Sequence, residues 1–132
     1  MNKLYSSLIM IGLFFLLPAG SWAYEAEGTI QGFHCVTTGK TCPLGKEDPM
    51  IAAERIFVLY TDNGTYYFIP NLDRAILARH IRERVRVTGE VNEKFRSLKA
   101  DIFEVKHGNG WKETWSKEME LELMNTLQLS PF

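Results

Sequence analysis

A β-hairpin at residues 55–69 constrains the fold of this chain more than any other feature of its sequence. The runs RIFVLY at 55–60 and TYYFI at 65–69 are rich in β-branched and aromatic residues, which favour strands. Asp62-Asn63-Gly64 lies between the two runs, and Asn-Gly in that place is a strong hairpin signal because both residues tolerate positive φ. The sequence therefore predicts a fold that contains antiparallel strands.

Three further segments predict strands. Residues 28–36 predict the first strand, in which two glycines would suit a bulge or a sharp bend. Residues 37–50 then predict a loop, because glycines and prolines would interrupt any regular element there. Apolar and polar residues alternate at 85–91, where Gly89 is an expected bulge, and again at 97–105. Both of these segments predict half-buried strands.

Two segments predict helices. Apolar residues recur at helical spacing over 72–81, Asn71 is a good N-cap for that helix, and the helix should end near Arg82. Ser116 can cap a second helix that runs to about Leu127 with an apolar stripe, and the two tryptophans before it fit a short extra strand or the helix start. We expect this helix to pack across the domain, as amphipathic helices usually do. An interaction helix for a partner is the alternative.

The order of these elements predicts the architecture. Three strands, a helix and two strands are the order of an OB-fold, a partly open five-stranded Greek-key barrel. Glycines within the strands fit a small barrel, because closure needs bulges and bends. We therefore expect a mainly β protein, with an OB-like barrel over residues 24–106, a helix between its third and fourth strands, and a C-terminal turn and amphipathic helix over 107–132. A small α+β sandwich with the same elements is the alternative.

The stretch VRVTGEV at 85–91 follows the short predicted helix and precedes LKADIFEV. In this setting it resembles the fourth and fifth strands of small bacterial exported OB-fold proteins. The resemblance is one of pattern and covers roughly residues 28–106. It implies a small periplasmic binding or stress-related domain without an enzymatic site.

Residues 1–23 predict a signal peptide. Lys3 supplies a short positive region, LIMIGLFFLL at 8–17 is an apolar run, and Ser21-Trp22-Ala23 places small residues where signal peptidase needs them. A membrane-spanning helix needs about 20 apolar residues, so the run favours a cleaved leader over an uncleaved anchor. We expect export to the periplasm or the extracellular space, and a mature chain that begins at Tyr24 with no transmembrane segment.

Charge and motifs exclude several classes of function. The chain has 15 Lys and Arg against 16 Asp and Glu, for a net charge of −1, and non-specific nucleic-acid binding depends on an excess of basic residues. The sequence contains no G-x-S-x-G, H-E-x-x-H, P-loop or G-x-G-x-x-G motif, and its two cysteines are not in a C-x-x-C motif. We expect neither an enzyme nor a cofactor.

The only two cysteines lie in GFHCVTTGKTCPLG at 32–45. Exported proteins usually pair an even number of cysteines, so Cys35 and Cys42 are expected to form a disulfide that closes a short loop. The alternative is a metal or thiol-redox site of His34, Cys35 and Cys42, with His80 or His107 as a further ligand. Adjacent residues of a strand point to opposite faces, which disfavours that site.

Two groups of side chains are candidates for binding. Arginines crowd the segment from the predicted helix into the following strand, where they would form a positive patch for an anionic partner, or only a solvated face. Aromatic residues flank the hairpin, where OB-folds stack ligands, or they only fill the barrel and cover its side. Asn63-Gly64-Thr65 also matches an N-glycosylation site, although its turn role explains it fully. The candidates for ligand or partner binding are Arg79, Arg82, Arg84, Arg86, Tyr60, Tyr66 and Phe68.

These observations predict an exported, non-catalytic OB-fold-like module that recognises an anionic, glycan or protein partner. Two alternatives remain. The protein is a structural or assembly subunit of a larger exported complex, or it is a small metal or thiol-redox protein.

Overall fold

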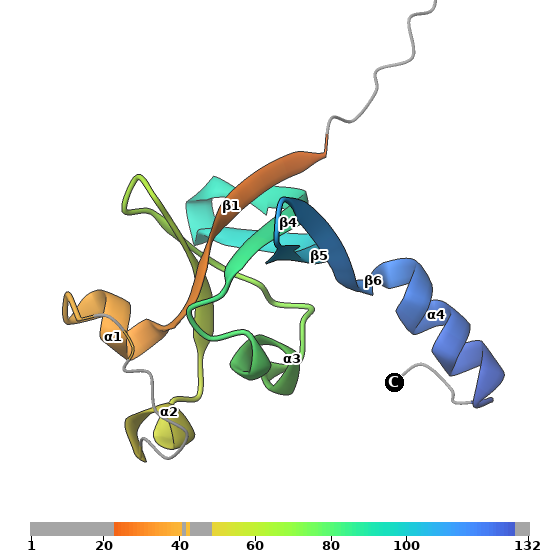
Figure 1. Ribbon diagram of the computed structural model, residues 1–132, viewed down its shortest axis with the longest axis horizontal. Helices are drawn as coiled ribbons and strands as arrows, with labels where there is room; N and C mark the ends of the chain where they lie inside the picture. The colour runs from red at the N-terminus through yellow and green to blue at the C-terminus, as the bar shows by residue number, and fades with distance from the viewer. Residues whose placement is uncertain (1–22, 41, 43–48, 129–132) are drawn as a thin grey trace, which may run out of the picture.

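The computed structural model describes residues 23–40, 42 and 49–128, and they form a mainly β protein (Figure 1). The predicted leader lies outside the described residues, apart from its last residue, Ala23. The strands are β1 (Tyr24–Gly32), β2 (Phe57–Thr61), β3 (Tyr66–Phe68), β4 (Arg84–Asn92), β5 (Ser97–His107) and β6 (Gly110–Ser116). The helices are α1 (Phe33–Thr37), α2 (Pro49–Ala53), α3 (Arg74–Arg79), the 3-10 turn η1 (Glu93–Phe95) and α4 (Lys117–Thr126).

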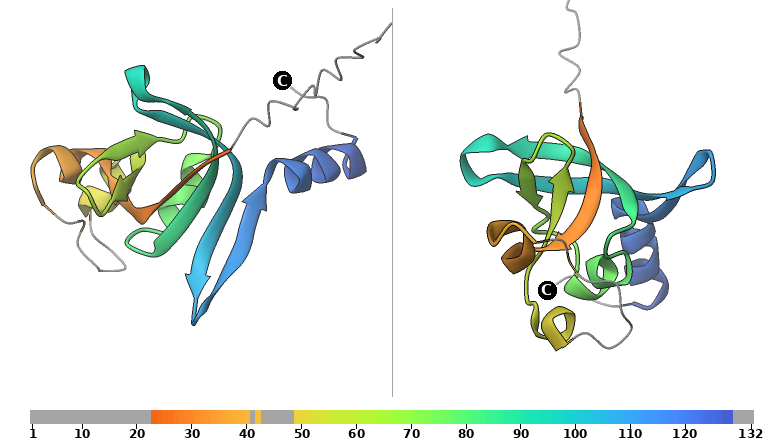
Figure 2. Two further views of the ribbon diagram at one scale, coloured as in Figure 1. Left: turned by 90° about the horizontal axis from the view of Figure 1, so that it is seen from above. Right: turned by 60° about the vertical axis from the view of Figure 1, so that its left-hand side comes forward.

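The six strands form one sheet that closes on itself like a ring. Their order is β3-β2-β1-β4-β5-β6, and all of these neighbours are antiparallel. A parallel pairing of Phe68 with Ser97 also joins β3 to β5. The helix α3 lies between β3 and β4 in the chain, as predicted. Figure 2 shows β1 crossing between the β2–β3 hairpin and the β4–β5 pair.

The buried core lies inside this ring. Alternate residues of each strand point inward, as the period of a strand requires. Phe103, Ile30, Leu59 and Val87 are completely buried there, and α3 adds Leu77. The ring therefore leaves the alternate set of side chains on an outer face.

The predicted hairpin and bulge are confirmed. β2 and β3 pair around the Asn63-Gly64 turn, where Gly64 has a φ of +82°. The pairing of β4 with β5 shifts register between Thr88 and Gly89. A side chain at Gly89 would meet the backbone of β5, so a glycine is required at this bulge.

The first strand differs from the prediction. β1 begins at Tyr24 and ends at Gly32, and the segment expected to continue it as a strand, 33–36, is helical in α1. Its early part extends as a strand because it pairs with β4 from Tyr24 to Thr29. The predicted loop 37–50 also contains the start of α2.

The helix α3 is shorter than predicted, and its cap is Asp73 rather than Asn71. The Asp73 side chain accepts a hydrogen bond from the backbone of Ala75 at 2.6 Å. Asn71 instead ties this segment to β5: its amide donates to the Ala100 carbonyl at 2.7 Å, and its carbonyl accepts from the Ala100 amide at 2.8 Å. The helix ends at Arg79 and is followed by a turn at Arg82, where the helix was predicted to end.

The C-terminal part contains a sixth strand, where the prediction had five. β6 pairs with β5, and its Trp115 is buried against the core. Ser116 caps α4 as predicted, accepting from the amide of Met119. However, α4 buries none of its residues and projects from the sheet (Figure 2), so the expectation that it packs across the domain is wrong. Within the described residues, no helix is long and apolar enough to cross a membrane.

Candidate functional site

The strand register places several predicted binding residues in one row on the outer face of the sheet. Thr29 in the middle of β1 pairs with Tyr60 on β2 and with Arg84 on β4. Tyr60 in turn pairs with Tyr66 on β3. Paired residues point to the same face of a sheet, so Tyr60, Tyr66 and Arg84 share the outer face with Thr29.

The connection after β1 covers part of this face. In α1, the ring of Phe33 packs against the rings of Tyr66 and Phe68, with centroids 5.6 and 5.3 Å apart. Cys42, which follows α1 in the chain, is buried, and its backbone amide donates to the side-chain oxygen of Gln31 at 3.0 Å. These contacts hold Phe33 against β3 and Cys42 against β1.

The two cysteines do not form the predicted disulfide, because no pair of described cysteines lies at disulfide distance. The Cys42 sulfur accepts a hydrogen bond from the Gly32 amide at 3.0 Å. Cys35 is on α1, since the first strand ends earlier than predicted. The described residues also hold no group of three or more His, Cys, Asp or Glu that could bind a metal ion, so His34, Cys35 and Cys42 do not converge.

A pocket of about 500 Å³ opens on the outer face between β1, β2 and the end of α1. Its wall of strand residues is mostly polar, and one exposed aromatic ring, Tyr60, stands beside it. Two cationic side chains line it: Lys40 from the connection that follows α1, and Arg82 from the segment between α3 and β4. The residues around the pocket are Thr29, Gln31, Val36, Gly39, Lys40, Tyr60, Thr61, Asp62 and Arg82.

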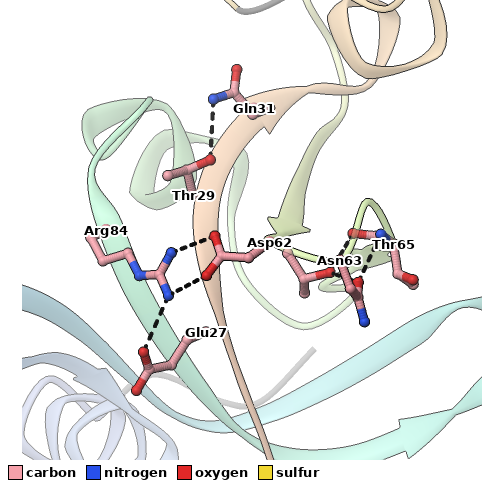
Figure 3. Close-up of polar contacts among 8 residues, drawn as sticks. Glu27, Thr29, Gln31, Asp62, Asn63, Thr65 and Arg84 are labelled. Carbon is pink, nitrogen blue, oxygen red and sulfur yellow. Dashed lines mark hydrogen bonds and ion pairs between the residues drawn. The ribbon is translucent and has the colours of Figure 1, made fainter.

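Hydrogen bonds join the polar residues that lie in and beside the floor of the pocket. The Gln31 amide donates to the Thr29 hydroxyl at 3.2 Å, and Gln31 is itself buried (Figure 3). Across β2, the Asn63 side chain accepts from the Thr65 amide at 3.0 Å and from the Thr61 hydroxyl, which holds the hairpin turn beside the pocket.

Beside the pocket, Arg84 is fully engaged with carboxylates. Its two terminal nitrogens donate to both oxygens of Asp62 at 2.7 Å, and one also reaches Glu27 at 3.3 Å (Figure 3). The hydrogen bond with Arg84 lowers the pKa of Asp62, and the same bond raises the pKa of Arg84. Both side chains are thus charged at neutral pH, and their charges compensate one another.

Arg86 has a similar arrangement one row further along β4. It forms a two-bond pair with Glu104 at 2.7 and 3.0 Å, which raises the pKa of Arg86, and Glu25 lies 3.9 Å away. Its guanidinium also stacks over the Trp111 ring, 4.6 Å from the centroid. Carboxylates therefore neutralise Arg84 and Arg86, the two arginines of the predicted positive patch that lie on β4.

The structure separates the predicted binding residues into three groups. Only Tyr60 and Arg82 lie at the pocket. Tyr66 and Phe68 belong to the aromatic cluster under α1, in which Arg96 stacks over Tyr66 with its guanidinium 4.9 Å from the ring centroid. The remaining arginines are the paired Arg84 and Arg86 and the exposed Arg79 on α3.

Seven of the nine residues around the pocket were not among the predicted site residues, and Thr29, Gln31 and Lys40 are three of them. Polar residues alternate along the first strand at Glu25, Glu27, Thr29 and Gln31. This alternation is the sequence signal that would have placed Thr29 and Gln31 on one face of the strand. Lys40 gives no such signal, because only the fold of the connection after β1 places it at the pocket.

We compared the chain with known protein families, with curated proteins and with solved structures, and found no match in any of the three comparisons.

Proposed function

We propose that this protein is an exported, non-catalytic binding module with an OB-like barrel, and that its outer-face pocket binds an acidic saccharide. The barrel assignment is supported by the ring-like closure through β3 and β5 and by the helix between β3 and β4. The predicted leader supports export.

The observation on which this function rests is the pair of cations at the pocket. Among the described residues, no carboxylate lies within ion-pair distance of Lys40 or Arg82. Arg84 and Arg86, in contrast, are compensated by carboxylates. An anion in the pocket would find two charged donors that need not first break an internal ion pair, and charge-assisted hydrogen bonds are the stronger kind.

The other pocket residues favour a hydroxylated ligand. The volume of about 500 Å³ falls within the range of small-molecule sites. Thr29 contributes a hydroxyl group, and Tyr60, which is 37% exposed, presents a ring against which a sugar face can pack. A mostly polar wall with one aromatic ring suits a saccharide better than an apolar ligand.

The backbone of Arg82 gives independent support. Arg82 has a φ of 63°, a left-handed conformation that is uncommon for residues other than glycine. Its amide donates to the Ile30 carbonyl at 2.8 Å, which anchors this conformation to β1. Strained backbone of this kind occurs often at functional sites, where it holds a side chain in place.

Isothermal titration calorimetry tests the proposal with an oligogalacturonide and a neutral malto-oligosaccharide of equal length. We expect binding of the acidic sugar only, and a loss of about 10-fold or more in affinity for Lys40→Ala and for Arg82→Gly, since hydrogen bonds to charged groups contribute about 1.5–3 kcal/mol. Arg82→Gly also relieves the left-handed backbone, so its thermal midpoint should not fall.

Arg79→Ala is the matched control, because Arg79 is an exposed arginine outside the pocket. It should bind as the unmodified protein does. Equal affinity for the neutral sugar, or equal losses for Arg79→Ala and Arg82→Gly, would contradict the proposed site.

A second candidate function, a subunit of an assembly, is favoured by one observation: α4 is a helix without a buried residue that presents Met119, Leu121 and Leu123 to solvent.

A further inference from the structure

The helix α4 combines an acidic and an apolar character on a fully exposed surface. Met119, Leu121 and Leu123 are each about half exposed, at 48%, 51% and 57%. Met119 and Leu123 are four residues apart and therefore share one face of the helix, and Glu118, Glu120 and Glu122 lie on either side of that face. A helix of this kind needs a surface that is apolar in its floor and cationic at its rim.

The chain has such a surface near the end of α2. A groove of about 320 Å³ has a floor of buried core residues that include Phe57, Leu72 and Leu77. Ile56 lies at its edge and is 46% exposed, which is unusual for a residue so close to the core. The groove is lined by Arg55, Ile56, Phe57, Phe68, Ile69, Pro70, Leu72, Arg74 and Leu77.

Two arginines supply the cationic rim. Arg74 is held in place, because its guanidinium donates to the Glu54 carbonyl at 2.7 and 2.9 Å and lies 5.3 Å from the centroid of the Phe57 ring. None of these partners is a carboxylate, so the charge of Arg74 is not compensated by them. The exposed Arg55 side chain forms no ion pair with a described carboxylate, although the backbone amide of Arg55 donates to the Glu54 carboxylate at 3.1 Å.

We propose that α4 of one copy of this chain docks into the groove between Arg55 and Arg74 of a second copy, and that α4 of the second copy docks into the groove of the first in the same way. Met119 and Leu123, which share one face of α4, would cover Ile56 and the groove floor, while the glutamates beside that face approach the two arginines. In one chain α4 and α2 lie apart in all three views (Figures 1 and 2).

Charge and symmetry select a second copy as the occupant. The complementary surfaces are present in the same chain, so two copies can satisfy both contacts through a twofold axis. An anionic membrane surface would repel the three glutamates of α4. This inference is independent of the saccharide pocket, which has no residue in common with the groove.

Sedimentation equilibrium of the full mature chain across the micromolar range tests the contact. We expect a monomer–dimer equilibrium in which Arg55→Glu, and separately Glu118→Lys combined with Glu120→Lys and Glu122→Lys, each raise the dissociation constant by about 10-fold or more. Arg79→Glu is the matched control, because Arg79 is exposed and outside the groove, and it should leave the dissociation constant unchanged.

Mixing the two charge-reversed variants gives the sharpest result. In the mixed dimer the groove that carries the Arg55→Glu change receives the lysine-bearing helix, and the unchanged groove receives the unchanged helix. We therefore expect the mixture to dimerise at concentrations where neither variant does so alone. A monomer at all concentrations would overturn the proposal, and so would a dimer that Arg55→Glu does not weaken, because that dimer would be held by another surface.

Discussion

Gly28 lies where β1 passes from its pairing with β4 to its pairing with β2, and replacing it with alanine should destabilise the protein strongly. Gly28 pairs with Thr61 on one side and with Val85 on the other. A β-carbon added there would lie 2.8 Å from the Tyr60 carbonyl carbon and closer still to its oxygen. Ordinary van der Waals contact begins at 3.4 Å, and backbone atoms of a paired strand cannot rotate away as a side chain can.

The magnitude follows from the displacement that relieves this overlap. The strands must separate by about 1 Å, a large fraction of the usual spacing of about 4.8 Å, and the nearest ladder hydrogen bonds would stretch beyond bonding distance. Loss of about two or three such bonds, at about 1 kcal/mol each, gives a destabilisation of about 2–3 kcal/mol. Overpacking of a tight site gives a similar value of about 1–3 kcal/mol.

Urea unfolding measured against Gly110→Ala isolates the effect. At Gly110 the nearest atom to an added β-carbon is 3.9 Å away, and the backbone is not left-handed. Any glycine-to-alanine change also stiffens the unfolded chain, by about 0.4–1 kcal/mol, and this contribution cancels between the two variants. A difference below about 0.5 kcal/mol between them would refute the close approach of β1 and β2, because it is less than one ladder hydrogen bond.

Three further perturbations test other parts of the structure. Because Arg84 lowers the pKa of Asp62 below its ordinary 3.8, this pair stabilises the fold above pH 3.8, and its contribution is lost as the pH falls through the lowered pKa. Arg84→Met should return the Asp62 pKa toward 3.8 in an NMR titration, and an unchanged pKa would exclude the pair in solution. Asn71→Ala removes two hydrogen bonds to the Ala100 backbone and should cost about 2 kcal/mol in urea unfolding, whereas a cost near zero would mean that water replaces them. Phe103→Ala empties a fully buried site and should cost about 3–5 kcal/mol by the same measurement, a range that a loosely packed core would not reach.

Most of the sheet could be predicted because its signals are local. Asn63-Gly64 fixes the hairpin through turn chemistry, and alternation identifies β4 and β5. The start of β1 was missed because Glu25 and Glu27 give it a charged appearance, and only the arginines of β4 make those positions favourable in a strand. Pairing between distant segments is not visible in a local window.

The candidate site was predicted only in part. The clustering of arginines in the sequence indicates a positive patch, but Asp62 and Glu104, distant in the chain, compensate Arg84 and Arg86. Tyr60 was identified from its strand, since alternate residues of β2 must face outward. Lys40 reaches the pocket only because the connection after β1 folds back on the sheet.

The helix α4 shows a different limit of sequence reasoning. Its apolar residues predict burial, and the pattern does not distinguish burial against the same chain from burial against another. In the structure Leu123 is 57% exposed, so its apolar side chain is not buried against the described part of the chain.

An NMR titration of the ¹⁵N-labelled protein with an oligogalacturonide tests the central claim most directly, because it locates binding residue by residue. We expect the amide shifts to concentrate around the outer-face pocket, at Thr29, Gln31, Lys40, Tyr60 and Arg82, and α4 to be unaffected. Shifts that concentrate on α4 or along the Arg55 groove, or no shifts at saturating ligand, would contradict it.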